Sequence, residues 1–566
     1  MKKNSAITLL FLVIAIIIQW PLHLYHDTPP MAACPSRDIC YHITNILQAK
    51  AAFQGGQIWL RTAPDLMQHF LYPIFQFYSP FFYMITGALA LGFQDPFSAL
   101  ELALLLISII GAWYTYALYH FLFKNEFYAL LGTALYFCSP YLIQNIDVRN
   151  DFTEAFSQCL FPVTLYYWFR LYEAPQWTRE KFYFLVAGIA SYYALITTHF
   201  ITLLTGTAFM LFLFAGLSWH QHRFRPLLGI FYCILGSIAL STWYIIPIFF
   251  EHALFIISNA NYQSPANNAW MAPLSSLLAF KAAASPNVIE RLHFPFSPAF
   301  GPLVIISAVY WYYQLYIKKI NRHFKEAALI QLSLWLFLLS AFIICSPLDL
   351  WPLLPRFTEI IQFPYRLLSE SMWLGGFLFV GMLTHAFRNR SLTWAPFIAS
   401  LICIISMGWQ WTAGYQDGTH TETTMRTLDP NYPSDYRIWP RLSDIPSHPY
   451  QSIAAIQKNC QTQNNQSICH LTIDQTHESI QLPILYYPKL LTIQANGHSL
   501  PYFPIIFPSP LPHSIILSGI TLPRGTYTIR SRFTGYNPAN IVSLIALGFY
   551  LMAILILIIQ SMKRRP

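Results

Sequence analysis

The feature that most constrains this chain is its repeated apolar runs, most of them roughly 17–24 residues long, the length a helix needs to cross a bilayer. Only 10% of the 566 residues are charged, against about 25% in soluble domains. The sequence therefore predicts a mainly α-helical, polytopic membrane protein with about twelve spans. They lie at residues 5–20, 98–121, 127–143, 153–170, 182–198, 200–217, 227–249, 300–317, 327–345, 367–387, 393–412 and 540–560.

A further run at 79–93 is short for a span, and the basic residues decide how it is interpreted. If Lys2 and Lys3 are cytoplasmic and 79–93 does not cross, every dense basic cluster falls on the cytoplasmic side. If it crosses, all later clusters move outside, against the usual distribution of Lys and Arg. We therefore expect 79–93 to form an interfacial or re-entrant helix, with both termini cytoplasmic. The basic clusters are Lys124, Arg170, 178–181, 220–225, 318–325, 388–390 and 563–565.

The segment 413–539 differs in kind from the rest. Several stretches within it alternate apolar and polar side chains, and Asn496-Gly497 is a hairpin signal. We expect a small extracytoplasmic β-sandwich, anchored by the final span. The predicted domains are a transmembrane module at 1–412, an outer loop and β-domain at 413–539, and the last span with a basic cytoplasmic tail at 540–566.

Two close cysteine pairs, Cys34/Cys40 and Cys460/Cys469, lie in polar segments that we expect outside the cytoplasm. Disulfides persist in such compartments, so each pair could form a local bridge. Four free thiols are the alternative. The other five of the nine cysteines lie in apolar runs, where cysteine packs as a small core residue.

An amphipathic helix is predicted after the first span. Apolar residues recur at helical spacing over 39–54, before Gly55-Gly56 ends the pattern, so the helix is expected to lie on the outer membrane surface. Asp38 stands at its start, where a carboxylate caps backbone N–H groups. The functional alternative makes Asp38 a general base, with His42 one turn along.

Arg61 follows in a segment rich in proline and aromatic residues. A lone arginine there either contacts lipid headgroups or holds a lipid-linked phosphate through paired hydrogen bonds. Arg149, Asp151 and Glu154 form a second group, for which a salt-bridged turn is the simplest interpretation. Glu154, however, begins an apolar helix, where ionisable groups are functional candidates.

His199 lies between two apolar runs, and Arg366 begins another. A structural histidine and an arginine that reaches for headgroups are the simpler interpretations. Taken together, these groups gather at one membrane face, which suits a substrate with a lipid tail and a charged headgroup. No Walker loop, dinucleotide fingerprint, CxxC…CxxC or HExxH motif occurs, so an ATP-driven or nucleotide-sugar enzyme has no support. The basic excess is explained by topology, without nucleic acid.

A series of short motifs follows the first span in order over most of the chain: Asp38 with His42, then GGQIWLR, YPIFQFYSPFFY, RNDFTEAF, TTHF, STWYIIPIFFE and FPYRLL. With its β-rich tail, the chain resembles the GT-C class of membrane glycosyltransferases, which use polyprenyl-phosphate-linked sugars. It resembles more closely a bacterial membrane family labelled "6-pyruvoyl-tetrahydropterin synthase-related".

The resemblance implies a GT-C-like fold with the catalytic aspartate in the first outer loop, which is Asp38. Glu154 is the best match to a second acidic site, and His42 would assist. Asp38 would deprotonate an acceptor hydroxyl, which attacks the sugar with inversion while polyprenyl phosphate leaves. The residues expected to bind substrate are Arg61, Arg149, Asp151, His199 and Arg366.

The chain departs from the family pattern in two respects: no second acidic residue flanks Asp38, and Asp151 and Glu154 are three positions apart rather than two. Use of a divalent metal is therefore left open. The implied setting is the bacterial inner membrane, and the implied partners are the lipid bilayer, a polyprenyl-phosphate-linked sugar and a glycan or lipid acceptor. Two alternatives remain: a catalytically inactive scaffold of the same fold, and a flippase or transporter of a lipid-linked glycan.

Overall fold

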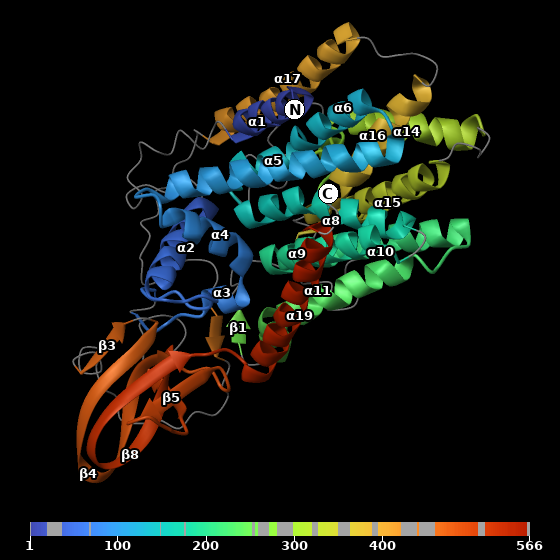
Figure 1. Ribbon diagram of the computed structural model, residues 1–566. Coiled ribbons are helices and arrows are strands. Elements are labelled where there is room, and N and C mark those ends of the chain that lie inside the picture. The colour runs from blue at the N-terminus through green and yellow to red at the C-terminus, as the bar shows by residue number, and fades with distance from the viewer. Residues whose placement is uncertain are drawn as a thin grey trace.

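Long helices form a bundle in the computed structural model, and an antiparallel sheet lies at one end of it (Figure 1). The structure describes residues 2–19, 37–66, 69–147, 149–174, 177–251, 255–257, 271–279, 298–319, 326–348, 361, 363–387, 394–419, 438–440, 459–463, 465–507 and 515–562. The helices are α1 (Lys2–Gln19), α2 (Arg37–Gln54), α3 (Ile74–Phe77), α4 (Pro80–Ala90), α5 (Pro96–Phe123), α6 (Glu126–Phe137), α7 (Pro140–Asp147), α8 (Phe152–Glu173), α9 (Arg179–Thr198), α10 (Phe200–Gln221), α11 (Leu227–Glu251), α12 (Leu274–Leu277), α14 (Pro302–Tyr312), α15 (Ala327–Cys345), α16 (Leu368–Ala386), α17 (Trp394–Thr419) and α19 (Asn537–Met562).

Six helices in the described part of the chain are long and apolar enough to cross a membrane. Each of the twelve predicted runs is helical over most of its length. The remaining six are shorter or more polar, so the count of twelve spans stays a prediction. The six candidate spans are α5, α10, α11, α15, α19, and α16 together with the 3-10 turn η7 (Pro364–Leu367) before it.

One predicted span is wrong as a single helix. The run 127–143 is divided between α6, which ends at Phe137, and α7, which begins at Pro140. Proline lacks a backbone N–H and clashes with the preceding turn, so a helix starts at Pro140 rather than passing through it. Every residue of the short α7 is buried, including the three polar side chains of its last turn, Gln144, Asn145 and Asp147.

Helix α2 also differs from its predicted setting. We expected it on the membrane surface, but Tyr41, His42, Asn45 and Ile46 are each no more than 5% exposed. The reason is the neighbouring α4, which packs against α2 together with α5. Helix α4 is the helical part of the run 79–93. Its 11 residues span about 16 Å, roughly half the hydrocarbon thickness of a bilayer.

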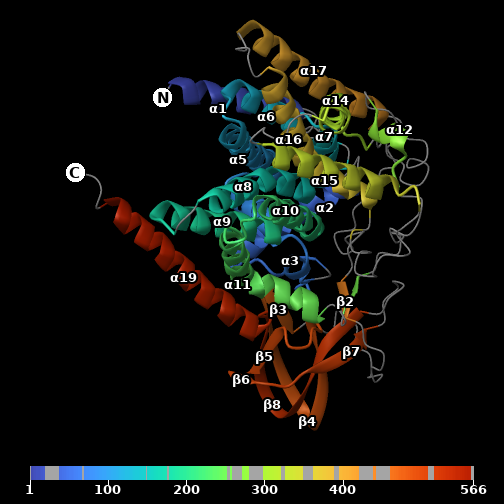
Figure 2. The ribbon, with the colours of Figure 1, turned by 90° about the vertical axis from the view of Figure 1, so that its right-hand side faces the viewer.

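Burial separates the centre of the bundle from its edge. The most apolar window of the segment Pro364–Ala386 is 83% buried, whereas that of α19 is 6% buried. Helix α16 packs on α6, α14 and α15, and α19 packs on α11 and α9. Figure 2 shows α19 running from the sheet along the outside of the bundle. The final helix is therefore apolar, and most of its surface is not covered by the rest of the protein.

The C-terminal sheet is entirely antiparallel, with the strand order β3-β4-β8-β5-β6 and β7 also paired to β8. The expected sandwich of two sheets is replaced by one sheet, because stretches predicted as separate strands run together in β4 and β8, which pair through two register shifts. A separate two-stranded ladder joins β1 (Phe255–Ile257) to β2 (Ile438–Pro440). The strands of the sheet are β3 (Cys460–Gln463), β4 (Gln466–Leu485), β5 (Leu491–Ala495), β6 (His498–Ser499), β7 (Phe503–Phe507) and β8 (Ile515–Phe533).

Two predicted details of the sheet are confirmed. Asn496 and Gly497 join β5 to β6, and both have positive φ, as a tight hairpin requires. Cys460 and Cys469 face each other across β3 and β4 and form a disulfide. The other proposed bridge involves Cys34, which lies outside the described residues.

The sheet is hydrogen-bonded to the end of α2 and to the segment that follows it. The Asn465 amide donates to the carbonyls of Ala52 and Gly55 at 3.0 and 2.8 Å. The backbone N–H of Leu485 donates to the carbonyl of Phe70 at 3.3 Å. The predicted boundary at 412 is shifted, because α17 continues to Thr419.

Candidate functional site

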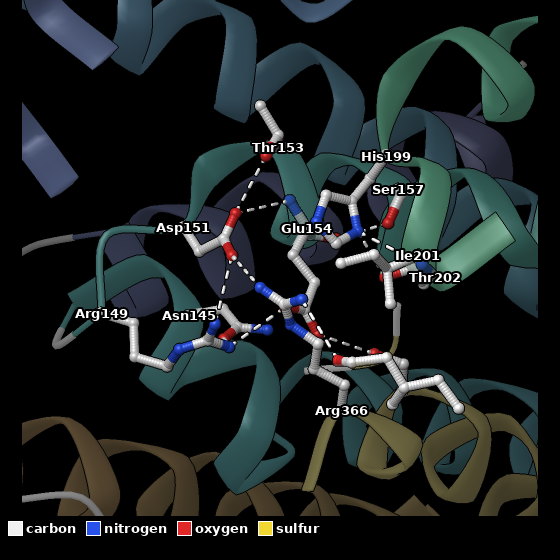
Figure 3. Close-up of polar contacts among 12 residues, drawn as sticks. Asn145, Arg149, Asp151, Thr153, Glu154, Ser157, His199, Ile201, Thr202 and Arg366 are labelled. Atoms are coloured by element: carbon white, nitrogen blue, oxygen red, sulfur yellow. Dashed lines mark hydrogen bonds and ion pairs between the residues drawn. The ribbon is translucent and has the colours of Figure 1, made fainter. Parts of the chain in front are cut away.

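A buried group of charged side chains lies where α8, α10 and α16 begin (Figure 3). Asp151 caps α8: one of its carboxylate oxygens accepts from the Glu154 backbone N–H at 3.1 Å and from the Thr153 hydroxyl at 2.9 Å. Glu154, in the first turn, is fully buried. A cap and a first-turn carboxylate both suit the positive end of the helix dipole. The local sequence therefore aims two carboxylates at one point.

Two arginines from different parts of the chain meet these carboxylates. Arg149 reaches Asp151 at 3.2 Å and Glu154 at 3.1 Å. Arg366, carried by the 3-10 turn before α16, lies 3.5 Å from Glu154 and 3.9 Å from Asp151. Figure 3 shows the Arg366 guanidinium between the two carboxylates, with Arg149 beside it. The four charges balance, which is the condition under which such groups tolerate burial.

Two histidines complete the group. His199 caps α10, because its Nδ1 accepts from the Thr202 backbone N–H at 3.4 Å. His42 is buried against Phe152, 5.2 Å between ring centroids, and its Nδ1 lies 2.7 Å from the Tyr83 hydroxyl. Burial lowers the pKa of His42 to about 4, although Asp151 opposes the shift. Burial likewise lowers the pKa of His199. Burial therefore favours the neutral form of both rings.

The surroundings keep Asp151 ionised. Burial alone would raise its pKa, but His199, Arg149 and Arg366 hold the pKa of the carboxyl below its usual value. The site thus combines two carboxylates with two guanidinium groups and two imidazoles. Such a set can hold a charged ligand and accept or donate a proton at separate atoms.

Three of these groups also form a candidate metal centre. Ligand atoms of Asp151, Glu154 and His199 all lie within 4.8 Å of one another. Two carboxylates and an imidazole are donors that divalent ions accept. The donor set therefore fits a divalent metal in kind. An ion at this point would replace guanidinium contacts, since Arg149 and Arg366 now pair with both carboxylates.

Sequence reasoning missed several members of the site. The Tyr141 hydroxyl donates to Glu154 at 2.6 Å, and the Ser369 hydroxyl donates to the same oxygen at 3.2 Å. Asn145 accepts from Arg149 at 2.6 Å. Glu370 lies deeper, fully buried, and accepts from Thr205 at 2.7 Å. Glu370 carried a usable signal, because a carboxylate inside an apolar span is a functional candidate; uncharged Tyr141 and Ser369 carried none.

Several polar atoms beside the site lack a hydrogen-bond partner within the described structure. They include both amide atoms of Gln144, the amide nitrogen of Asn145 and both carboxylate oxygens of Asp147. Burial raises the pKa of Asp147 well above its usual value. Unsatisfied buried polar atoms are uncommon in proteins. A bound polar ligand would provide the partners that these groups lack.

The predicted site residues are thus only partly brought together. The structure gathers His42, Arg149, Asp151, Glu154, His199 and Arg366. The backbone at Asp38 lies in the first turn of α2, but its side chain lies outside the described structure. Arg61 belongs elsewhere: its guanidinium donates to Gln76 and Asn540, and neither residue contacts the carboxylates. Arg61 is therefore not part of this charged group, and its role in substrate binding stays a prediction.

Comparison of the sequence with protein-family models gave no match, and comparison with curated proteins gave none either.

Proposed function

We propose that this protein is a membrane glycosyltransferase with a GT-C-like fold of about twelve spans. It moves a sugar from a polyprenyl-phosphate donor to a glycan or lipid acceptor outside the cytoplasm. The observation that carries the proposal is the buried pair of guanidinium groups, Arg149 and Arg366, set among two carboxylates at the starts of three helices. Helix starts and arginines together attract phosphate.

The arginines suit the charge that the reaction would create. When the bond between sugar C1 and the phosphate oxygen breaks, its electron pair stays on the polyprenyl phosphate. A positive charge positioned beforehand lowers the energy of that developing anion. Arg149 and Arg366 are held in place by carboxylates, so they need no rearrangement at the moment of transfer. The imidazole of His199 beside them can donate a hydrogen bond to the same phosphate.

The acceptor hydroxyl needs a base, and the proposal gives this role to Asp38. Residues 38 and 42 are one turn apart in α2 and share a face of that helix. His42 on this face lies against Phe152 and is influenced by Asp151. The acceptor oxygen forms the new bond to C1 with inversion, and its proton passes to the Asp38 carboxylate. General base catalysis of this kind contributes roughly 10²–10⁴-fold.

The disulfide supports an extracytoplasmic setting for the sheet. Disulfides such as Cys460–Cys469 persist in oxidising compartments. With the sheet outside, α19 returns the chain to the cytoplasm, where the basic tail at 563–565 agrees with the positive-inside tendency. The proposed location is therefore the bacterial inner membrane, with the charged site and the sheet facing outward.

The proposal is tested by transfer with the purified full-length protein in lipid. A panel of polyprenyl-phosphate sugars and acceptors is offered to the wild type, Asp38→Asn, Arg366→Gln and the control Glu180→Gln, with and without divalent metal. Glu180 is an exposed partner in a surface ion pair. We expect transfer by the wild type and the control, and its loss in the two site variants.

Other outcomes separate the alternatives. Equal turnover in the wild type and Asp38→Asn would show that Asp38 is not the general base, and helix capping would be its remaining role. The closed ion-pair network is also what a non-catalytic scaffold of this fold would retain. Donor binding that depends on Arg366, without transfer to any acceptor, would therefore replace the transferase proposal with the scaffold. Loss of activity on chelation would assign the metal to Asp151, Glu154 and His199.

A further inference from the structure

A polar cavity lies away from the carboxylate site, where the end of the sheet meets the start of α19. It has a volume of about 350 Å³ and is bounded by the segment after α2, by α11 and by the ends of β8 and α19. Figure 2 shows these elements converging, with α19 leaving the sheet beside α11. The residues that matter for its chemistry are Trp59, Arg61, Trp243, Arg532, Asn537 and Asn540.

The cavity is positively charged and holds no acidic side chain among its described lining residues. Arg61 is 8% exposed, and its guanidinium donates to the neutral amides of Gln76 and Asn540, the latter at 2.6 Å. Burial and the neighbouring Arg532 lower the pKa of Arg61 to about 10. A buried cation facing a second cation is costly without an anion.

The guanidinium of Arg61 is held in a fixed position. Its face lies over the Trp243 ring, 5.2 Å from the ring centroid. A Cβ added to Gly535 would stand 2.1 Å from Arg61 Nη1, and Gly535 has a φ of 70°, which favours glycine. The indole of Trp243 and the two amide acceptors therefore hold the guanidinium beside the backbone that follows β8.

The cavity lies at the N-terminal end of the apolar helix α19. Asn537 and Asn540 belong to the first turn of α19, and Leu544 extends the lining along the apolar part of that helix. Leu544 is 53% exposed. The two tryptophans, Trp59 and Trp243, are of the type enriched at membrane interfaces. One end of the cavity is thus cationic, and the other continues onto an uncovered apolar helix.

We propose that this cavity binds the phosphate group of a membrane lipid, with Arg61 and Arg532 contacting the phosphate and the acyl chains lying along α19. The site differs from the carboxylate site, and the proposal does not rest on glycosyl transfer. It accounts for the burial of Arg61 without a carboxylate and for the apolar face of α19 that begins at the cavity.

The test is calorimetric titration of the purified full-length protein in neutral detergent. The probes are dihexanoyl phosphatidate, dihexanoyl phosphatidylcholine and inorganic phosphate. The variants are Arg532→Gln and, as a matched control, Arg524→Gln, which removes an exposed arginine of the same strand that does not line the cavity. Arg532 is itself exposed, so its replacement leaves the fold intact. Arg61→Gln is a second variant, with its thermal unfolding measured beside it.

We expect the wild type and Arg524→Gln to bind phosphatidate more tightly than either other probe. We expect Arg532→Gln to weaken that binding about tenfold or more, because a charge-assisted hydrogen bond is lost. Equal binding by Arg532→Gln and Arg524→Gln would overturn the site. Binding of inorganic phosphate as tight as that of phosphatidate would overturn the lipid as occupant, and so would absence of binding by every probe.

Discussion

His42 is a buried imidazole whose neutrality makes the stability of the protein depend on pH. Its pKa is about 4 in the folded chain, against about 6.5 in an unfolded one. Between these values the unfolded state binds more protons, so stability falls as the pH falls from about 6.5 to about 4, by up to about 3 kcal/mol. We expect the melting temperature of His42→Gln to depend less on pH across this range than that of the wild type.

The control for this experiment is His470→Gln, which changes an exposed histidine on the sheet. Thermal unfolding is followed by intrinsic fluorescence in detergent at a series of pH values. If His42→Gln and the wild type lost stability in parallel on acidification, the neutral form of His42 would not be responsible.

Glu154 anchors the charged site, and its loss should be far more costly than that of a surface carboxylate. Glu154→Gln leaves Arg149 and Arg366 buried with one carboxylate between them. Breaking a buried pair in this way costs about 3–5 kcal/mol. The matched change Glu180→Gln breaks the pair with Arg170, in which Glu180 is 68% exposed, and should cost about 1 kcal/mol or less. Similar unfolding temperatures for the two variants would contradict the ion-pair account.

Charge and spacing show why some site residues were predictable. Arg149, Asp151 and Glu154 are neighbours in sequence and had to lie together. His199 and Arg366 were recognisable because each stands at the end of an apolar run. Tyr141 and Ser369 have no signature that separates them from ordinary interior residues. The surroundings of Arg61 could not be predicted, because its partner Asn540 lies 479 positions away in the sequence.

Glycines let the central helices approach closely. A Cβ on Gly376 of α16 would lie 1.8 Å from the Tyr119 hydroxyl, and Tyr119 itself is buried in α5. We expect Gly376→Ala to destabilise the protein by about 1–3 kcal/mol, because the packed tyrosine must move. Gly548→Ala is the control: no atom lies within 4 Å of its new Cβ in α19. Thermal unfolding in detergent compares them, and equal stability would show that the crossing tolerates a methyl group.

The elements were predictable where the pattern was long and uniform. Apolar runs above about 17 residues gave helices with ends close to those expected, because length and apolar content suffice for such segments. The break at Pro140 was missed because the apolar pattern runs through it. The sandwich was wrong for a related reason: alternation indicates strands but not where a strand bends, and β4 continues through its bulge near His477.

The orientation of the whole molecule follows from where the sheet lies. His498 and His220 are both exposed, the first on the sheet and the second at the end of α10. In intact cells, a membrane-impermeant maleimide should label His498→Cys and leave His220→Cys unlabelled until the cells are lysed. The native Cys403 is also exposed, and Cys34 and Cys40 lie in a segment expected outside the cytoplasm, so both changes are made in a background in which these three cysteines are replaced by alanine. Labelling of His220→Cys in sealed cells would place the sheet inside and reverse the proposed topology.

The hydrogen bond from Arg61 to Asn540 also has a consequence for how the protein is made. Its two residues are 479 positions apart, so at about 5–20 residues per second the ribosome needs roughly 25–100 s to supply the second after the first. Arg61 therefore leaves the ribosome long before its acceptor Asn540 is synthesised. A ribosome that stalls before α19 would leave this arginine without it, at the edge of an otherwise assembled bundle. Helix α19 therefore completes the contacts of Arg61 only on chains that have been translated beyond Asn540.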